Sequence, residues 1–432
     1  MLERLFQLVQ HQTDVKKEVT GGLASFLTMA YILCINPLIL SQAGMDKGAV
    51  FVATCLAASF GCILMGLIAN YPIALAPSMG LNVFFTYGVV IQLGHSWQVA
   101  LGAVFLSGVA FLVISLFRIR ELIVEKIPLS LRQGIATGIG LFLTLISLKI
   151  AGIVVVDDNT QLTLGNVFSF EAAMWVIGLL VMIGFAARSW RGGMLVAIAV
   201  ITIISLLYGK SDVDGIISAP PDAAATYMAM DLSGALDIGL LAVVFAFLFV
   251  DLFDSATSLV AVAQRGGLLN TAGRFARFGK ALFADASATL FGASLGTSTV
   301  TTYVESTAGV AAGGRTGLTS VVVGLLFLVA IFFYPLIDAV PLAAASPVIF
   351  YVATLMLAGL INVEWEDLTE AIPVVITAIV MPLTMSIANG IALGFISYTL
   401  IKLVAGRYKQ LNALVIVLSI FFTAELLLRA HN

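Results

Sequence analysis

Charged residues are scarce in this sequence of 432 residues. Lys, Arg, Asp and Glu together make up 10% of it, hydrophobic residues make up 60%, and the mean hydropathy is +1.09. A soluble domain carries roughly 25% charged residues, so the composition excludes a water-soluble fold of this length. The net charge is only −3, which gives no electrostatic reason to expect nucleic acid as a partner.

Cysteine and histidine are equally rare, with three of each. The cysteines lie in apolar runs without the spacing of metal ligands, so neither a disulfide framework nor a metal centre is expected. The histidines fall in or near loops and termini, which argues against a histidine proton relay inside a membrane. The sequence has no phosphate-binding loop, so we expect no cofactor, and any active transport would draw on an ion gradient. Residues 1–17 do not have the pattern of a cleaved signal peptide.

Long apolar runs dominate what is present. A membrane-spanning helix needs about 20 mostly apolar residues, and many segments approach that length. The candidates lie near 19–40, 49–69, 73–91, 97–117, 129–150, 171–187, 192–208, 237–262, 281–297, 300–313, 317–334, 343–361, 371–387, 389–404 and 411–429. Several are short. We therefore expect an all-α polytopic membrane protein with about fourteen spans, in which 411–429 is either the fourteenth span or an additional segment.

Basic residues are concentrated in alternate connections between these segments. Those on one side are Arg4, Lys16, Lys17, Arg118, Arg120, Lys126, Arg132, Arg188, Arg191, Arg265, Arg274, Arg277, Lys280, Arg315, Lys402, Arg407 and Lys409. The opposite connections carry acids such as Asp157, Asp158, Asp212 and Asp214. Because cytoplasmic loops are enriched in Lys and Arg, the pattern predicts a plasma-membrane protein with its N-terminus in the cytoplasm.

Two of the segments are interrupted by residues that oppose a helix. Residues 71–82 contain Pro72, Pro77 and Gly80, and residues 292–302 are rich in glycine and threonine. Non-helical backbone at membrane depth is tolerated only beside protein or a wet cavity. Breaks at corresponding places indicate inverted repeats with the substrate site between them. We expect short extended segments at these breaks, in the third and tenth spans. The two spans lie seven apart, so we expect repeats at 1–208 and 237–432, joined by an extracellular or periplasmic linker at 209–236.

Three carboxylates lie inside these apolar segments. Asp251 and Asp254 are three residues apart on the eighth span, so they share a helix face. An ionised carboxylate at this depth costs at least ~2.5–3.5 kcal/mol, so each should face a cavity, pair with a donor or hold a proton. An aspartate that only satisfies the unwound backbone of a neighbouring span is the structural alternative. Because desolvation favours the protonated acid, we expect Asp254 to carry a proton, with Asp251 and Glu305 as further candidates.

Glu305 follows the second interruption, in the first turn of a helix. The N–H groups and the dipole of a helix N-terminus favour an anion or an acceptor-rich ligand there, although a simple capping role would also fit. Asn82 follows the first interruption, and its amide can both donate and accept. It could equally join two helices by a hydrogen bond.

The neighbours of these residues suit a small, planar, polar ligand. Backbone N–H groups near Gly80 and Ser306 could donate to it, and the rings of Phe249 and Tyr303 could stack on it. Most aromatic residues in so apolar a protein serve packing alone. We expect Glu305, Asp251, Asn82, Gly80, Ser306, Phe249 and Tyr303 to bind substrate.

Several stretches resemble the AzgA-like purine permeases of the nucleobase–ascorbate, or xanthine/uracil permease, superfamily. They are residues 36–40 (NPLIL), 43–46 (AGMD), 74–85 (ALAPSMGLNVFF), 249–255 (FVDLFDS), 305–309 (ESTAG) and 313–319 (GGRTGLT). The resemblance runs from about residue 15 to the C-terminus. It carries the family's acidic pair onto Asp251 and Asp254, its tenth-span glutamate onto Glu305 and its asparagine onto Asn82. Ser78 stands where glycine or alanine is common, beside the expected pocket.

The resemblance implies a 7+7 inverted-repeat fold. Spans 1–4 and 8–11 would form a core domain, and spans 5–7 and 12–14 a gate domain. It also implies an elevator movement, a homodimer, and proton-coupled uptake of adenine, guanine or hypoxanthine. The runs around Asp254 and Asn82 lean toward the adenine branch, so adenine is favoured, with hypoxanthine and guanine next.

Two other functions fit the residues less well. An anion transporter of the same fold would be expected to place basic or neutral groups where this chain has three carboxylates. An intramembrane aspartyl protease would need carboxylates from two segments facing each other, whereas Asp251 and Asp254 lie on one helix. The sequence therefore predicts a transporter and not an enzyme.

Overall fold

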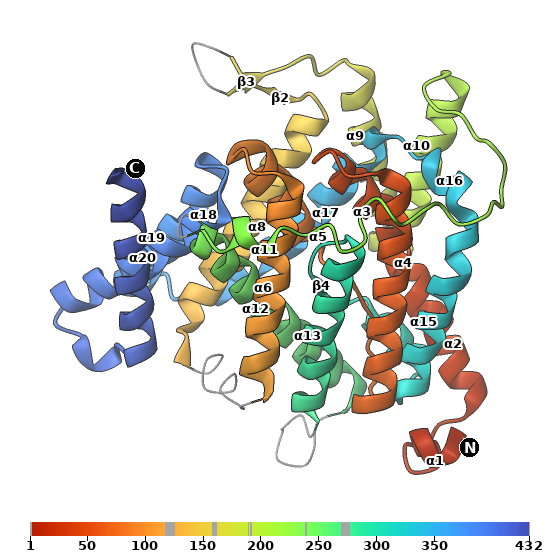
Figure 1. The fold of residues 1–432 in the computed structure, drawn as a ribbon, viewed down its shortest axis with the longest axis horizontal. Coiled ribbons are helices and arrows are strands. Elements are labelled where there is room, and N and C mark those ends of the chain that lie inside the picture. The colour runs from red at the N-terminus through yellow and green to blue at the C-terminus, as the bar shows by residue number, and fades with distance from the viewer. Residues whose placement is uncertain are drawn as a thin grey trace.

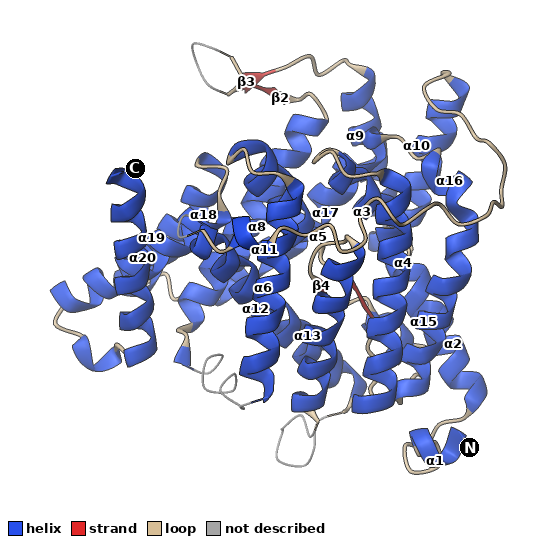
Figure 2. Cartoon of the chain, viewed as in Figure 1, coloured by secondary structure: helices blue, strands red, loops and turns tan. Residues whose placement is uncertain are grey.

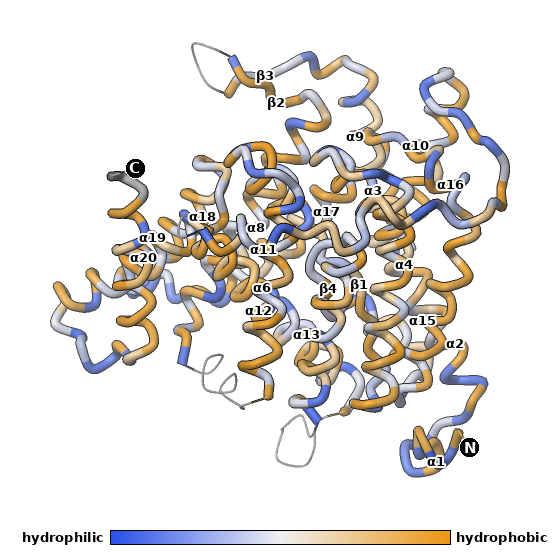
Figure 3. The backbone as a smooth tube through the Cα atoms, viewed as in Figure 1, coloured by the Kyte–Doolittle hydropathy of each residue, from blue (hydrophilic) through white to orange (hydrophobic). Residues whose placement is uncertain are grey.

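The computed structural model describes residues 2–116, 126–157, 162–188, 190, 192–237, 240–268 and 277–431. Helices make up most of this part of the chain, and most of the long ones lie side by side (Figures 1 and 2). Figure 3 shows that apolar residues cover the middle of the helices and that hydrophilic residues gather in the connections. Five residues used above to predict orientation lie outside the described ranges: Arg118, Arg120, Asp158, Arg191 and Arg274.

The first seven predicted spans each correspond to helical segments. They are α2 (Val15–Met29) with α3 (Ile32–Ser41); α4 (Lys47–Leu64) with the π-helical Met65–Ala69; β1 (Leu75–Pro77) with α5 (Met79–Val83) and the π-helical Phe84–Gln92; α6 (Trp97–Leu116); α8 (Leu129–Ile150); α9 (Phe170–Ala187); and α10 (Gly193–Leu207). A short helix, α1 (Leu2–Phe6), precedes them, and β2 (Val154–Val155) and β3 (Thr163–Leu164) form a hairpin between α8 and α9.

The remaining spans follow α11 (Leu232–Ala235). They are α12 (Leu241–Gly266); α13 (Phe278–Leu295); β4 (Val300–Thr302) with α14 (Ser306–Ala311); α15 (Gly317–Ala330) with Ile331–Phe333 and α16 (Tyr334–Asp338); Leu342–Ala344 with α17 (Ala345–Leu357) and Ala358–Asn362; α18 (Leu368–Leu383); and α19 (Ile387–Val404). The helix α20 (Ala413–His431) follows α19 and covers most of the segment 411–429.

The helices have the dimensions of a polytopic membrane protein. Within the described residues, nine helices are long and apolar enough to cross a bilayer, and four shorter apolar helices accompany them. Figure 1 places α1 at one end of the helices and the β2–β3 hairpin at the other. The predicted all-α polytopic fold is confirmed.

The two interrupted spans meet as a pair of antiparallel strands in the middle of the protein. Leu75 of β1 lies opposite Thr302 of β4, and Pro77 lies opposite Val300. The pairing extends beyond both strands, because the N–H of Ser78 donates to the carbonyl of Thr299 (2.8 Å) and that of Tyr303 to the carbonyl of Ala74 (3.0 Å). All six strand residues are buried. The strands thus satisfy part of each other's backbone groups, and side chains of neighbouring helices accept from others, such as Cys62 from Leu75 and Thr289 from Val300.

The helices pack in two groups that match the predicted core and gate. In the core group, α4 packs against α13 and α15, α6 against α12 and α13, and α2 against α14 and α15. In the gate group, α8 packs against α17, α18 and α19, and α9 against α10 and α17. Contacts of α12 with α19 and of α5 with α8 join the two groups.

Glu18 connects α2, the first helix of the core group, to α15, the last. Its side chain is fully buried, and its carboxylate accepts from the backbone N–H groups of Arg315 (2.9 Å), Thr316 (3.2 Å) and Thr319 (3.2 Å). The hydroxyl of Thr319 donates to it as well, at 2.6 Å. A carboxylate on α2 therefore caps the free N–H groups at the start of α15.

We expect Glu18→Ala to lower the thermal unfolding temperature of the purified protein markedly. Each buried donor left without an acceptor costs about 1–3 kcal/mol. Glu18→Gln should lower the unfolding temperature less, because the amide keeps one acceptor oxygen. Glu171→Ala is a matched control, since Glu171 stands in the first turn of α9 and its side chain is 45% exposed. Equal unfolding temperatures for wild type and Glu18→Ala would contradict the capping role.

Candidate functional site

A cavity of about 260 Å³ lies beside the strand pair, between the core and gate groups. Its core side is formed by α5, α12, β4 and the start of α14, and its gate side by α8 and α17. Of the predicted site residues, those that line it are Gly80, Asp254, Tyr303 and Glu305. Ser78, singled out above as a departure from the family pattern, lines it too. The structure therefore brings together residues from the third, eighth and tenth spans.

Asp254 is the aspartate of the eighth span that faces this cavity. It is half-buried, and the hydroxyl of Ser78 donates to its Oδ2 at 3.3 Å. A hydrogen bond of this length is weak, so a ligand can replace it. Thr257, one turn further along α12, lines the same cavity. The carboxylate is thus within reach of a ligand and only loosely held by the protein.

Glu305 enters the cavity from the start of α14. The hydroxyl of Tyr31, which immediately precedes α3, donates to its Oε1 at 2.9 Å, which fixes one carboxylate oxygen. No other side chain in the described part of the chain donates to this carboxylate, and Glu305 is half-buried. Sequence reasoning missed Tyr31, although a tyrosine within the apolar run 19–40 was the available signal.

Tyr303 and Gly80 shape the wall next to the strands. The hydroxyl of Tyr303 donates to the carbonyl of Pro77 at 2.5 Å, and its ring lies 6.5 Å from that of Tyr31. A Cβ on Gly80 would lie 3.3 Å from Cγ2 of Ile139 on the gate helix α8. Any larger side chain at position 80 would therefore press against the gate group.

Asp251 lies behind the strands and not in the cavity wall. It is 1% exposed, and the hydroxyl of Thr289 on α13 donates to it at 3.3 Å. A fourth carboxylate, Asp285 of α13, is fully buried nearby and accepts from Ser255 at 2.6 Å, which in turn contacts Thr301 of β4 at 2.6 Å. Asp285 was missed by sequence reasoning, although an aspartate inside the apolar run 281–297 could have indicated it.

Three other residues predicted to bind substrate make contacts outside the cavity. Asn82 is fully buried and accepts from the hydroxyl of Ser298, so it joins α5 to the segment before β4. The N–H of Ser306 donates to the carbonyl of Tyr303 at 3.1 Å. Phe249 is 4% exposed and packs between the rings of Phe253 (6.2 Å) and Phe395 (6.1 Å). None of the three lines the cavity.

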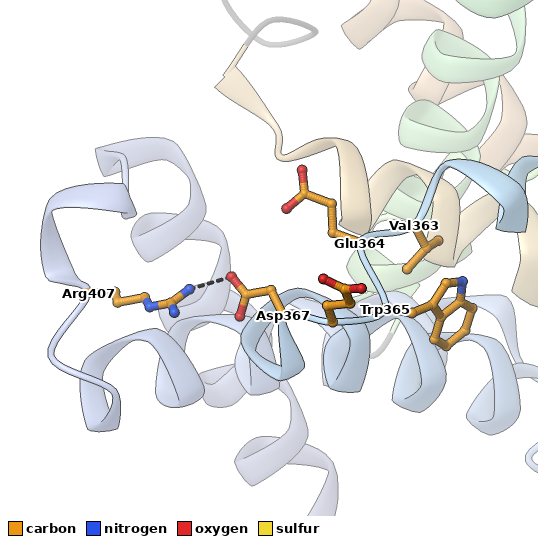
Figure 4. A pocket seen from close by; sticks show the side chains of 6 residues that line it. Val363, Glu364, Trp365, Asp367 and Arg407 are labelled. Atoms are coloured by element: carbon orange, nitrogen blue, oxygen red, sulfur yellow. Dashed lines mark hydrogen bonds and ion pairs between the residues drawn. The ribbon is translucent and has the colours of Figure 1, made fainter.

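A larger pocket, of about 680 Å³, lies apart from these residues at the N-terminus of α18 (Figure 4). Its lining includes Glu364, Trp365, Asp367 and Arg407, and Figure 4 shows Arg407 paired with Asp367. Hydrogen bonds from Thr369, and then from Arg407, lower the pKa of Asp367 to about 2. The pair therefore stays ionised at physiological pH, and the pocket shares no residue with the central cavity.

A cavity that contains two carboxylates and lies between two groups of apolar helices is the arrangement expected of a multi-pass membrane transport protein. The chain belongs to the Permease family, whose sequence pattern matches residues 16–393. It is 45% identical over 426 residues to the adenine permease AdeP of Escherichia coli (strain K12), covering 99% of this chain and 96% of AdeP. It is 40% identical over 430 residues to the guanine/hypoxanthine permease PbuO of Bacillus subtilis (strain 168), covering 98% and 99%. Its function is therefore transport and not enzymatic catalysis.

The same fold occurs in a solved structure of low sequence similarity. The transmembrane domain of the cyanobacterial bicarbonate transporter BicA superposes with a TM-score of 0.66 at 14% identity, covering 88% of this chain and 97% of that domain. This likeness concerns the fold alone.

Proposed function

We propose that this chain carries purine nucleobases across the plasma membrane in symport with protons. Adenine is the favoured substrate, followed by hypoxanthine and guanine. The named activities of AdeP and PbuO support this range of substrates, because both relatives align along nearly the whole chain. The protein would act as a homodimer with its N-terminus in the cytoplasm, with no cofactor other than the proton gradient and no nucleic-acid partner.

The observation that carries the proposal is the joint presence of Asp254 and Glu305 in one small cavity. A purine base offers ring N–H and exocyclic amino donors, and carboxylate oxygens are strong acceptors for such donors. Glu305 is the substrate anchor, because Tyr31 holds one of its oxygens in place and leaves the other to the ligand. The ring of Tyr303 and the backbone at Gly80 complete a narrow polar wall suited to a flat molecule.

Asp254 is the proposed proton carrier. Its weak bond to Ser78 leaves it open to water and substrate from the cavity, so it can gain and lose a proton as the cavity changes sides. Asp251 is the second candidate, because a fully buried carboxylate is costly to ionise, but it lacks contact with the cavity. Glu305 is the third.

The two walls of the cavity differ in a way that supports an elevator movement. The polar side chains that line it come from α12, from β4 and from the residues that precede α3, α5 and α14 or follow β4, all in the core group. The described gate residues in the lining are Ile139, Val352, Leu355 and Met356. An apolar gate wall makes no hydrogen bond that would have to break when the core slides past it. The core group would then carry substrate and proton together between the two sides.

Uptake of radiolabelled adenine into proteoliposomes tests the proposal. We expect accumulation when the side bearing the substrate is more acidic, and simple equilibration when no pH difference is imposed. Unlabelled hypoxanthine and guanine should compete, and a protonophore should abolish accumulation without preventing exchange. Equal uptake with and without the gradient would contradict symport. Transport of bicarbonate or sulfate in place of adenine would favour the anion-transporter alternative.

A further inference from the structure

Three phenylalanines of α12 form a row of stacked rings, called the phenylalanine row below. Phe245, Phe249 and Phe253 are four residues apart, so their side chains follow one ridge of the helix. The ring centroids of Phe245 and Phe249 are 6.1 Å apart, and those of Phe249 and Phe253 are 6.2 Å apart. Phe249, a predicted stacking ring for substrate, is instead the middle member of this row. Because rings and spacings are alike, the row presents a similar surface after each helical turn.

Two rings from the gate side pack against the phenylalanine row. Phe421 of α20, a helix that packs against the gate helix α19, lies edge-on to Phe245 with centroids 4.7 Å apart. Phe395 of α19 lies 6.1 Å from Phe249. In the described part of the chain no gate ring packs against Phe253, which borders a cavity and is 9% exposed. The gate rings therefore meet the first two members of the row and leave the third without a gate partner.

The cavities show to which side this conformation is open. From Asp254, cavity space continues to Arg132 at the start of α8. From Glu305, it continues to Arg265 in the last turn of α12. The distribution of basic residues predicts that both helix ends face the cytoplasm, so this conformation faces inward. Along α12, Phe245 is then the outermost member of the row.

We propose that the phenylalanine row is the sliding contact between the core and gate groups, with two stable registers one helical turn apart. This role rests on the proposed elevator movement. In the outward-facing register, the core group has moved outward by one turn, about 6 Å for four residues, so Phe421 meets Phe249 and not Phe245. Phe395 then meets Phe253. Each register makes two ring contacts of the same kind, whereas positions between them make poorer ones. The ridge is inclined by about 26° to the helix axis, so the core group moves obliquely to α12.

Substitutions at the two ends of the row should shift the two states in opposite directions. Phe245 contacts a gate ring only in the inward-facing register, and Phe253 only in the outward-facing one. Phe245→Leu should therefore raise the ratio of outward-facing to inward-facing protein about twofold to tenfold, the contribution of one aromatic pair. Phe253→Leu should lower the ratio by a similar factor. Phe247→Leu is the matched control, because Phe247 packs against Phe84 inside the core group, at 5.1 Å, and this contact moves with the group.

The ratio is measured with Thr257→Cys as a reporter, without any purine. Thr257 is exposed on α12 and lines the central cavity. A membrane-impermeant maleimide should reach it from the cytoplasmic side in the inward-facing state and from the outside in the outward-facing state. Labelling rates in inside-out and right-side-out vesicles give the two populations. The natural cysteines are at most 4% exposed, so protein without the reporter serves as the blank.

Cross-linking gives an independent measurement of the same movement. Phe245 and Phe253 both lie one turn from Phe249, which faces Phe395 in the described register. A short bifunctional thiol reagent should join the double variant Phe253→Cys/Phe395→Cys, because these positions meet in the outward-facing register. Phe245→Cys/Phe395→Cys should not be joined, since that pair meets in neither register. Equal cross-linking of both pairs, or of the second alone, would refute the proposed registers.

The outcomes separate the sliding contact from purine transport. Shifts of the same sign in Phe245→Leu and Phe253→Leu, or an equal shift in Phe247→Leu, would refute the sliding contact. Labelling of the reporter from the cytoplasmic side alone would refute the movement itself, and the role of the row with it. Adenine uptake by wild-type proteoliposomes is assayed in parallel. Opposite shifts without adenine uptake would refute purine transport alone, whereas uptake without opposite shifts would refute the sliding contact alone.

Discussion

An Asp254→Asn variant is expected to exchange purine across the membrane but to lose uptake driven by a pH gradient. Asparagine keeps the shape of the side chain and one acceptor oxygen, but it cannot take up and release a proton. Exchange needs only loaded crossings, so it should persist, whereas accumulation against a gradient should fall more than about tenfold, since a 1.4 kcal/mol loss of driving force is already tenfold. Exchange is measured with proteoliposomes loaded with unlabelled adenine. Accumulation is measured with empty proteoliposomes under an imposed pH gradient.

Two further variants make this expectation specific to Asp254. Thr257→Val alters the same wall of the same cavity without removing a titratable group, so it should retain accumulation. Asp251→Asn tests the buried aspartate on the same helix. If Asp254→Asn still concentrates adenine and Asp251→Asn does not, the proton is carried by Asp251, behind the strands.

Glu305→Gln should raise the adenine concentration for half-maximal uptake roughly tenfold to a hundredfold. Hydrogen bonds to a charged group contribute about 1.5–3 kcal/mol, and each 1.4 kcal/mol is a factor of ten. The glutamine keeps the size of the side chain, so the cavity should retain its shape. Measuring uptake over a range of adenine concentrations distinguishes this loss of binding from a loss of turnover.

Tyr31→Phe provides the companion measurement. It removes the 2.9 Å hydrogen bond that holds Glu305 while leaving the carboxylate in the cavity, so the half-saturating concentration should rise less than in Glu305→Gln. Because the two side chains form one unit, the double variant should be no worse than Glu305→Gln alone. Additive losses would mean that Tyr31 contacts substrate independently of Glu305.

Much of the fold could be predicted because a bilayer limits the possible structures. Apolar runs located the spans, and proline, glycine and threonine located the two interruptions. The pairing of β1 with β4 was not predicted, because strands of three residues carry no local signal for a partner so distant in the chain. The segment 411–429 was predicted as a helix by its apolar run, and α20 occupies it.

The sequence predicted which residue types form the site, but not which of their side chains face the cavity. Asp251 and Asp254 are alike in sequence and adjacent on one helix face, yet one is sealed behind Thr289 and the other borders the cavity. Which of them meets the cavity depends on the rotation of α12 against α13 and the strands. Tyr31 and Asp285 were missed for a related reason, since a single polar residue in an apolar run does not indicate its partner.

The pairing of β1 with β4 also constrains how the protein is made. The hydroxyl of Tyr303 bonds to the carbonyl of Pro77 across 226 residues of chain. At about 5–20 residues per second, a ribosome needs roughly 10–45 s to synthesise that interval. During that time the backbone of residues 75–77 has no β4 to satisfy its polar groups. The nascent third span must therefore wait in a hydrated or chaperoned place, beside the translocon or near the membrane surface, before it settles at its final depth.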